Sequence, residues 1–408
     1  MFAFRSAPIV LHNEMFVYCT IAGTNIQSAQ NKTVPGVREV IMKQWLVGLL
    51  LLLSPSAFAQ DSPPEIQFDS VPNLLKLPPD MHLGEATGVA VNSKGHIFVY
   101  SRGGTVGNAF GATASQLLEF DRDGMFIREI GKNLYAWAFG HTVRVDKDDN
   151  IWATDKGSDM IVKFNPEGRV QMLFGRKPES SDAEAKPHER GHTPPLPHVD
   201  GRFRQPSDVT WDSAGNIYIS DGYVNARVAK ISKDGDWIKS WGSKGKGPGQ
   251  FDLLHTIAAD AQDNIYVGDR NNRRIQVFDT EGNLKNTIRI DVPPPTDGKP
   301  AIGNLPNLAN YLESGGSQTP GAPWAICITP PGPNQIMYVS DSFPGRVYKL
   351  SLDGKVLGWM GKSGKQLKQF GWVHQIACPS ENEIYVAEIL TWRVQKLVMP
   401  QGQQRAMR

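Results

Sequence analysis

The chain has 408 residues, of which 40% are hydrophobic and 21% are charged, a composition typical of globular proteins. Its formal net charge of +2 is close to neutral. The sequence contains no block of lysine and arginine and no basic strip rich in aromatic residues. We therefore expect no nucleic-acid partner.

The N-terminal region has the pattern of an export signal. A leucine-rich run over residues 45–53 follows Met42-Lys43 and precedes an Ala-x-Ala site that ends at Ala59. This pattern predicts a signal peptide over residues 42–59, cleavage near Ala59, and export to the periplasm or the medium. We interpret residues 1–41, which lack the pattern, as an over-extended reading frame. The alternative is an uncleaved anchor, but the run is well under the ~20 residues that span a bilayer, and we expect no stable membrane insertion.

Six copies of one unit occupy residues 60–400. Each copy has an apolar strand, a turn with Asp, Asn or Gly, a second strand that mostly ends in an acid, a polar loop, a third strand and another turn. Alternating β-branched and aromatic residues followed by Asp-Gly or Glu-Gly turns are typical of strands and hairpins. Helical periodicity is absent from residues 65–398. The second strand is clearest, at residues 96–101, 150–155, 216–221, 264–269, 336–341 and 383–388.

This repeat predicts an all-β fold, a six-bladed β-propeller of four-stranded blades. The sixth copy stops near Val398 without a fourth strand, whereas the apolar segment 65–77 precedes the first copy. We predict that this N-terminal segment supplies the missing strand, which would leave no open edge in the ring. A linear array of hairpins is the alternative, but isolated hairpins are only marginally stable. Residues 401–408 are expected to form a short tail.

Three stretches break the repeat, at residues 103–115, 176–203 and 291–322. Long loops on a rigid ring are typically functional or disordered. The second contains His188, His192 and His198, which could form a secondary metal site. We interpret them instead as residues of an exposed, proline-rich loop.

Two cysteines lie within the propeller region, on the first strands of neighbouring copies. They are Cys327 and Cys378. Spacing alone does not establish disulfide geometry, so we expect two buried free thiols, with a bridge as the alternative.

Three histidines occupy one position of the repeat in every second copy. They are His141, His255 and His374, and the other copies have Thr87, Ser207 and Trp324 there. Alternate copies of a six-membered ring sit a third of a turn apart, so the three imidazoles would converge on the axis. Three nitrogen ligands with a free fourth position are typical of a catalytic zinc site, although copper, nickel and iron also bind imidazole. The alternative is three hydrogen-bonded core histidines.

The polar and charged residues near the strand ends fall into two groups. Those that recur are assigned a structural role in capping turns: Asp155, Asp221, Asp269, Asp341, Glu388, Arg227, Arg274, Arg346 and Arg393. Departures from the repeat are better catalytic candidates, namely Arg102, Tyr223 and Arg270. A tyrosine beside a metal can act as an acid or base, and an arginine can bind a carboxylate with two hydrogen bonds. We therefore expect a substrate with a carboxylate.

Several tracts resemble the peptidyl-α-hydroxyglycine α-amidating lyases, namely residues 221–227, Leu254-His255, residues 269–276 and Val373-His374. Residues 241–251 and 358–370 resemble the NHL repeats on which that family is built. The likeness covers nearly all of residues 85–398. It implies a six-bladed propeller with a catalytic zinc that cleaves the N–C bond of a C-terminal α-hydroxyglycine, releasing glyoxylate and a peptide amide.

The resemblance also implies roles for individual residues. His141, His255 and His374 would hold the zinc, Tyr223 would be the general base on the substrate hydroxyl, and Arg102 and Arg270 would hold the substrate carboxylate. Two positions depart from the family. Gln375 stands where the family commonly has an aspartate linked to a structural calcium, which makes calcium doubtful here. Val224 stands where animal members have a disulfide cysteine.

We therefore predict an exported, zinc-dependent carbon–nitrogen lyase. It would act as a monomer on a peptide or on a small N-acyl-α-hydroxyglycine or similar carbinolamide. A second hypothesis is a non-enzymatic NHL propeller that binds a protein or glycan on one rim; the three histidines argue against it, and Gln375 keeps it open. A third, a calcium-dependent lactonase-like propeller, needs a central set of Glu, Asn and Asp oxygens that the inner positions do not supply.

Overall fold

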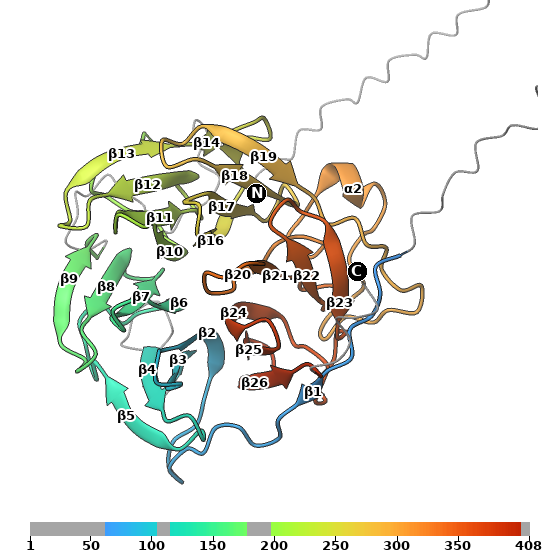
Figure 1. Ribbon diagram of the computed structural model, residues 1–408, viewed down its shortest axis with the longest axis horizontal. Coiled ribbons are helices and arrows are strands. Elements are labelled where there is room, and N and C mark those ends of the chain that lie inside the picture. Colours follow the sequence, from blue (N-terminus) through green and yellow to red (C-terminus); the bar gives the residue numbers. More distant parts are fainter. Residues whose placement is uncertain (1–61, 104–114, 178–196, 401–408) are drawn as a thin grey trace, which may run out of the picture. The chain divides into compact units, whose positions relative to one another are not determined.

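Six four-stranded antiparallel sheets stand around a central axis as the blades of a propeller (Figure 1). The structure, a computed structural model, describes residues 62–103, 115–177 and 197–400. The predicted signal peptide (42–59), residues 1–41 and the tail (401–408) lie outside the described residues. The prediction of an all-β, six-bladed propeller of four-stranded blades is confirmed.

Each blade runs outward from its first strand, so the inner strands surround the axis. Blades 1 to 3 consist of β2 (Glu85–Val91), β3 (Ile97–Arg102), β4 (Ser115–Phe120) and β5 (Phe126–Ile130); β6 (Gly140–Val145), β7 (Ile151–Asp155), β8 (Met160–Phe164) and β9 (Val170–Phe174); and β10 (Asp208–Trp211), β11 (Ile217–Asp221), β12 (Arg227–Ile231) and β13 (Trp237–Trp241).

The second half of the ring repeats this order. Blades 4 to 6 consist of β16 (Leu254–Ala259), β17 (Ile265–Asp269), β18 (Arg274–Phe278) and β19 (Leu284–Ile288); β20 (Ala325–Ile328), β21 (Ile336–Ser340), β22 (Val347–Ser351) and β23 (Val356–Met360); and β24 (Val373–Ser380), β25 (Glu383–Glu388), β26 (Arg393–Val398) and β1 (Asp69–Ser70).

Short elements lie between the blades. The strands β14 (Ser243–Lys244) and β15 (Gln250–Phe251) form a small parallel pair between blades 3 and 4. Helix α2 (Tyr311–Ser314) is a single turn within the long loop that precedes blade 5. Across the described ranges, no helix is long and apolar enough to cross a lipid bilayer.

Aspartate side chains shape the turns between the first and second strands. In blade 2 the carboxylate of Asp146 accepts hydrogen bonds from the backbone N–H of Asp148 and of Asn150, both at 3.0 Å. Asp212 and Asp260 accept the equivalent bond in blades 3 and 4. Such side-chain bonds to the local backbone favour a tight turn over a continued strand, which is why the sequence pattern predicted the hairpins.

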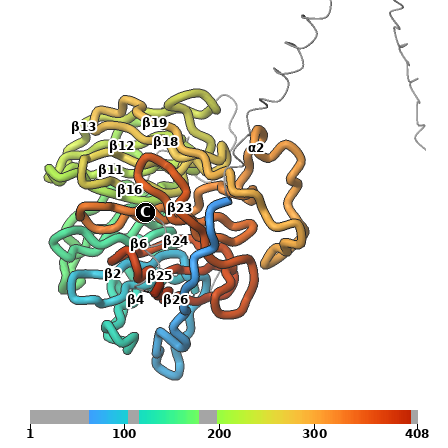
Figure 2. Tube along the Cα trace, turned by 45° about the vertical axis from the view of Figure 1, so that its right-hand side comes forward, coloured from blue at the N-terminus to red at the C-terminus, as the bar shows by residue number. Residues whose placement is uncertain are grey.

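The N-terminal segment completes blade 6, as predicted, because β1 pairs antiparallel with β26. The paired strand is only two residues long. On either side of it, Glu65 forms a bridge to Trp359 in blade 5, and Lys76 forms a bridge to Met125 beside β5 in blade 1. The segment, blue in Figure 2, therefore ties three consecutive blades together along their outer edges.

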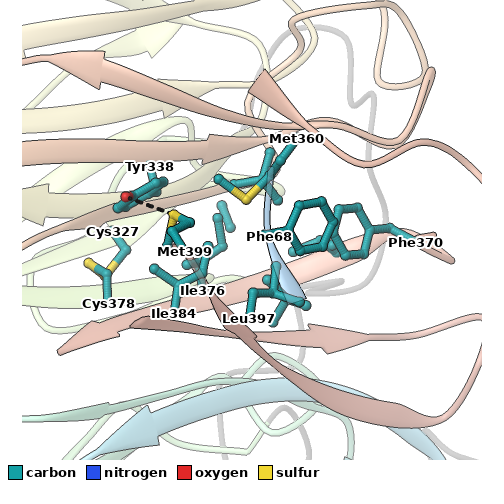
Figure 3. Close-up of a cluster of buried hydrophobic side chains, with 14 of the residues drawn as sticks. Phe68, Cys327, Tyr338, Met360, Phe370, Ile376, Cys378, Ile384, Leu397 and Met399 are labelled. Atoms are coloured by element: carbon teal, nitrogen blue, oxygen red, sulfur yellow. Dashed lines mark hydrogen bonds between the residues drawn. A yellow bond between two sulfur atoms is a disulfide. The ribbon is translucent and has the colours of Figure 1, made fainter. Parts of the chain in front are cut away.

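Apolar side chains fill the space between neighbouring blades. Between blades 5 and 6, the rings of Phe68 and Phe370 stack with their centroids 6.2 Å apart (Figure 3). Met360, Ile376 and Leu397 are fully buried around them. Because Phe68 comes from the N-terminal segment and Leu397 from the last strand, closing the ring buries apolar surface from both ends of the described chain.

Cys327 and Cys378 form a disulfide in the same cluster (Figure 3). The expectation of two buried free thiols is therefore wrong. Cys327 lies on β20 and Cys378 on β24, the inner strands of adjacent blades, and their Cα atoms are 6.0 Å apart, within the range that a bridge requires. Sequence spacing could not show this, because the two strands become neighbours only when the blades pack.

Replacing both cysteines by serine should lower the free energy of unfolding by about 2–4 kcal/mol, because the bridge restrains the unfolded chain. Chemical denaturation of the wild type and of Cys327→Ser/Cys378→Ser measures this loss. Reducing agent should destabilise the wild type to a similar extent and leave the double variant unchanged. A double variant as stable as the oxidised wild type would show that the bridge contributes nothing to stability.

Candidate metal centre

The three alternate histidines lie on the inner strands β6, β16 and β24, whose labels surround the centre of Figure 1. In each strand the pairing with the second strand shifts register across the histidine. Each histidine is therefore the extra residue of a β-bulge, an irregularity that redirects a side chain. Blade 1 has the same shift across Thr87, so four of the six blades share the bulge, whereas the pairings of blades 3 and 5 show no such shift.

The blades that lack the histidine hold the imidazole rings through their backbone. The Nδ1–H groups of His141, His255 and His374 donate to the carbonyl oxygens of Ser207, Trp324 and Thr87, at 2.6, 2.5 and 2.7 Å. Because a carbonyl oxygen only accepts, the proton lies on Nδ1 and the free lone pair on Nε2. Blades with and without the histidine therefore alternate for a physical reason. One blade supplies the candidate ligand, and the next blade orients it.

The three imidazoles converge into one buried cluster. Their ring centroids are 4.8 Å (His141–His255), 4.5 Å (His141–His374) and 4.8 Å (His255–His374) apart. One nitrogen from each lies within 4.8 Å of the others. Within the described ranges, His255 Nε2 is a buried atom without a hydrogen-bond partner. An orphaned nitrogen beside two others fits a metal ion held by three imidazoles.

The electrostatic surroundings favour neutral histidines. Burial is the main cause that lowers the pKa of each ring well below its usual value of 6.5. Nearby cations lower it further: Arg102 and Lys156 act on His141 and His374, and Arg270 acts on His255 and His374. Neutral imidazole is the form that binds metals.

Tyr223, the predicted general base, lies beside the histidines. Its hydroxyl is 3.0 Å from His141 Nε2, and its ring meets the rings of His141 and His255 at centroid distances of 5.3 and 5.8 Å. Gly222 permits this approach, since a Cβ there would lie 1.8 Å from the carbonyl oxygen of Leu254. The Asp-Gly-Tyr tract therefore needs its glycine to bring the tyrosine onto the axis.

Arg102 reaches the same region but is already engaged. Its Nη1 donates to the Glu85 carboxylate at 2.7 Å, and its Nε donates to the carbonyl of Gly140 at 2.8 Å. Its guanidinium lies 3.6 Å from the centre of the Phe139 ring. Arg102 therefore holds the residue that directly precedes His141, and Glu85 neutralises much of its charge.

Arg270 lies over two aromatic rings that flank the histidines. Its guanidinium carbon is 4.2 Å from the Trp324 ring centroid and 5.8 Å from the Tyr223 ring centroid. Trp324 in turn packs against His255 and Trp372, both with ring centroids 5.2 Å away. Blades 4 to 6 therefore present a cation and two indoles next to the histidines.

Sequence reasoning missed Lys156, which the structure places beside Tyr223. Its Nζ is 4.1 Å from the centre of the Tyr223 ring. A signal was available: Lys156 directly follows the strand-ending Asp155, just as Arg102 follows Ser101 and Arg270 follows Asp269. Comparing that register position across all six copies would have identified it.

The recurring acids are structural, as predicted. Asp155 accepts hydrogen bonds from the backbone N–H groups of Ala138 and Ser158, and Asp341 accepts them from Gly345 and Arg346. Each acid thus caps the turn to the third strand. Asp155 also holds the segment that leads into the inner strand. Three of the four recurring arginines pair with these acids, at Arg227–Asp221, Arg274–Asp269 and Arg393–Glu388, whereas the side chain of Arg346 donates to the Pro293 carbonyl.

Gln375, next to His374, links its own blade to two others by hydrogen bonds near the axis. Its Oε1 accepts hydrogen bonds from the N–H groups of Val89 (3.1 Å) and Val143 (3.0 Å), and its Nε2 donates to the Val143 carbonyl at 2.6 Å. The side chain therefore joins blades 1, 2 and 6. Calcium requires oxygen ligands, whereas this position offers an N–H donor to the Val143 oxygen. The residues present do not fit a calcium ion.

Arg144 and Asp208 form a second set of hydrogen bonds that joins blades near the axis. Arg144 Nε donates to Asp208 Oδ1 at 3.0 Å, and its Nη2 also donates to the carbonyl oxygens of Ile257 and Ile326 at 3.3 and 3.1 Å. These bonds join blades 2 to 5. Sequence reasoning gave no sign of this pair.

The long loops differ in what the structure describes. Residues 104–114 of the first loop, and His188 and His192 in the second, lie outside the described residues. His198 donates through Nε2–H to the Asn225 carbonyl oxygen, 2.5 Å away. The third loop is fixed to blade 4, where Arg273 donates to the carbonyls of Pro320 and Ile290, both at 2.6 Å.

Comparison with known proteins gives the same fold. A family model described as a 6-bladed beta-propeller matches residues 200–298. The peptidyl-alpha-hydroxyglycine alpha-amidating lyase 1 of Drosophila melanogaster is 24% identical over 352 residues, covering 78% of this chain and 58% of that protein. The chain is a homologue of the amidating lyases and of NHL repeat proteins. The resemblance predicted from the sequence is confirmed.

Two further relatives show the breadth of this homology. The peptidylglycine alpha-amidating monooxygenase of Rattus norvegicus is 29% identical over 221 residues, which cover 48% of this chain but only 21% of the rat protein. The NHL repeat-containing protein 3 of Mus musculus is 29% identical over 208 residues, covering 47% of this chain and 51% of that protein. The chain therefore matches only part of each relative's length.

A solved structure shares the fold at low sequence identity. Virginiamycin B lyase from Staphylococcus aureus aligns with a TM-score of 0.50 and 14% identity, covering 82% of this chain and 100% of that one. At this identity the likeness concerns the propeller fold alone.

Proposed function

We propose that this protein is a zinc-dependent carbon–nitrogen lyase. It would cleave the N–C bond of a C-terminal α-hydroxyglycine, or of a similar N-acyl carbinolamide, to an amide and glyoxylate. The reaction consumes no water and no oxidant. The carbinol hydroxyl loses its proton, its C–O bond becomes a carbonyl, the N–C bond breaks, and the amide nitrogen takes up a proton.

One observation carries the proposal: a phenol hydroxyl lies 3.0 Å from a ring nitrogen of a buried cluster of three neutral histidines. A zinc ion held by His141, His255 and His374 would supply an open position that acidifies a hydroxyl group. Tyr223 stands where it can take the hydroxyl proton as general base. The homology to named amidating lyases supports the same chemistry.

The remaining residues would bind the substrate. Arg270 and Arg102 carry the positive charge that the glyoxylate carboxylate needs, and Arg102 also bonds Glu85. Trp324 and Trp372 give blades 5 and 6 an aromatic surface on which an apolar acyl group can pack. The substrate is then a peptide or a small N-acyl-α-hydroxyglycine, bound by a monomer without nucleic acid.

Export belongs to the same proposal. The predicted signal peptide over residues 42–59 would deliver the chain to the periplasm or the medium. The disulfide between Cys327 and Cys378 supports an oxidising compartment.

Replacing Tyr223 by phenylalanine should lower kcat by about 10²–10⁴-fold, the usual contribution of a general base. The assay is glyoxylate release from N-benzoyl-α-hydroxyglycine by the zinc-loaded protein, with zinc content measured in parallel. Tyr218→Phe is the matched control, because the Tyr218 hydroxyl bonds Asp212 in the same blade, away from the histidines. It should retain full activity.

Two outcomes would contradict the proposal. Wild-type protein that carries zinc but releases no glyoxylate would reject the lyase reaction and leave a binding propeller, like other NHL repeat proteins, as the better account. Full activity of Tyr223→Phe would reject Tyr223 as the base.

A further inference from the structure

A cavity lies on the outer side of blades 5 and 6. Its volume is about 680 Å³, within the range of roughly 300–1,000 Å³ that is typical of small-molecule sites. Three parts of the chain line it: residues 65–68 of the N-terminal segment, residues 295–299 of the long loop before blade 5, and residues between 344 and 369 that flank the outer strand β23. The three histidines lie on inner strands, and none of them lines this cavity.

Arg346 departs from the repeat at the wall of this cavity. Its three counterparts pair directly with the acid that ends the second strand of their blade. In blade 5 that acid, Asp341, accepts hydrogen bonds from the Tyr348 hydroxyl at 2.7 Å and from the Gly321 N–H at 3.0 Å. The Arg346 charge still acts on Asp341, but across the described ranges no direct ion pair joins the Arg346 side chain to a carboxylate. Because the phenol occupies the acid, the guanidinium turns toward the cavity.

The Arg346 guanidinium is buried against the cavity wall. Only 5% of the residue is exposed, and the guanidinium carbon lies 3.9 Å from the centre of the Trp359 ring. Its Nη1 donates to the Pro293 carbonyl at 2.8 Å. A guanidinium offers five N–H donors in a planar fork, and a buried charge is unfavourable unless it is paired. A carboxylate or phosphate bound in the cavity would supply that pairing through two parallel hydrogen bonds.

Ser363 gives an independent indication of a ligand. Its hydroxyl oxygen is buried and, in the described part of the chain, has no hydrogen-bond partner. The residue lines the same cavity. Its backbone N–H donates to the Pro344 carbonyl at 2.7 Å, which holds Ser363 against the turn that precedes Arg346. A buried hydroxyl without a partner is unfavourable, so an acceptor oxygen on a ligand would complete the site.

The lining combines positive charge with apolar surface. Four basic and two acidic side chains line the cavity: Lys299, Arg346, Lys362, Lys368, Glu65 and Asp297. Lys368 is already matched by Asp69, 2.8 Å away, and of the six only Arg346 is buried. The charge deep in the cavity is therefore positive. Phe68, Trp359 and Leu367 add apolar surface beside it.

We propose that this cavity is a binding site for a small organic anion, with its carboxylate or phosphate group at Arg346 and Ser363 and its apolar body toward Phe68 and Leu367. The volume is far larger than an inorganic ion needs, so the ligand is organic. The inference concerns a site outside the metal centre and does not depend on the proposed lyase reaction.

A photoreactive anion tests both the binding and its location. 4-Benzoylbenzoate has a carboxylate, an apolar body and a ketone that inserts into neighbouring C–H bonds under ultraviolet light. Calorimetry on the zinc-loaded full chain should show that it binds, with the neutral 4-benzoylbenzamide and inorganic phosphate each about tenfold weaker or more. Mass spectrometry of the irradiated complex should place the crosslink within residues 65–68, 295–299 or 359–369.

Substitutions then assign the binding to the cavity. Arg346→Met should lower the affinity for 4-benzoylbenzoate by about 10- to 100-fold, the range for hydrogen bonds to a charged group, and Arg346→Lys should restore part of it. Ser363→Ala should lower the affinity by about 3- to 10-fold, and it serves if Arg346→Met fails to fold. Lys355→Met is the matched control, since Lys355 is exposed before β23, at the opposite end of that strand from the cavity. It should bind like the wild type.

Four results would contradict the site: no binding of 4-benzoylbenzoate by the wild type, an equal affinity for the amide, an equal affinity for phosphate, or unchanged affinity in both Arg346→Met and Ser363→Ala. A crosslink confined to the inner strands around His141, His255 and His374 would also contradict it, because the probe would then occupy the metal centre. A wild type that releases no glyoxylate rejects the lyase reaction alone and leaves these measurements unaffected.

Discussion

His255→Ala should reduce bound metal from about one zinc per chain to nearly none and abolish glyoxylate release. Structural zinc sites in zinc-finger peptides bind the ion with about 10–16 kcal/mol over all ligands. By that scale the loss of one ligand costs about 3 kcal/mol or more, which is about a hundredfold in affinity or more. His255 is the sharpest choice because its Nε2 is buried and, in the described part of the chain, has no hydrogen-bond partner. Elemental analysis of protein purified without chelators measures the change.

A second histidine provides the control for this result. His96 lies in blade 1, where its Nδ1 is 2.8 Å from the Glu119 carboxylate, away from the cluster of three. His96→Gln should therefore keep the zinc and the activity. Zinc retained in His255→Ala, or absent from a folded wild type even after zinc is added, would contradict the metal site.

Gln375→Ala should lower the free energy of unfolding by about 2–4 kcal/mol. The substitution leaves the Val89 N–H, the Val143 N–H and the Val143 carbonyl without their partner, and an unsatisfied buried group costs about 1–3 kcal/mol. A water molecule entering the space would recover part of this loss. Chemical denaturation, with cooperativity checked by two spectroscopic probes, measures the effect.

The exposed Gln366 provides the comparison, since Gln366→Ala should change stability by less than about 0.5 kcal/mol. Calcium gives an independent measurement. Because the Gln375 amide donates to the Val143 oxygen, adding calcium or a calcium chelator should leave the melting temperature of the wild type unchanged. A clear stabilisation by calcium would show that the axis binds the ion after all.

Much of the site could be predicted because the signal was repeated. Six copies of a strand pattern made the ring predictable, and the ring's symmetry then placed His141, His255 and His374 together although more than a hundred residues separate each from the next. Tyr223 and Arg270 were predicted because each departs from the repeat at a known register. Lys156 was missed although it stands at the same register as Arg270, directly after a strand-ending acid.

The sequence by itself determined the blades, the capping acids and the position of each histidine, because each follows from residues within a few positions of one another. Only the tertiary structure decided which groups meet across blades. It paired Cys327 with Cys378, placed the Ser207, Trp324 and Thr87 carbonyls on the imidazoles, brought Lys156 over Tyr223, and reduced the closing strand to Asp69–Ser70. These contacts join residues far apart in the chain, and their geometry depends on how the blades pack rather than on any local pattern.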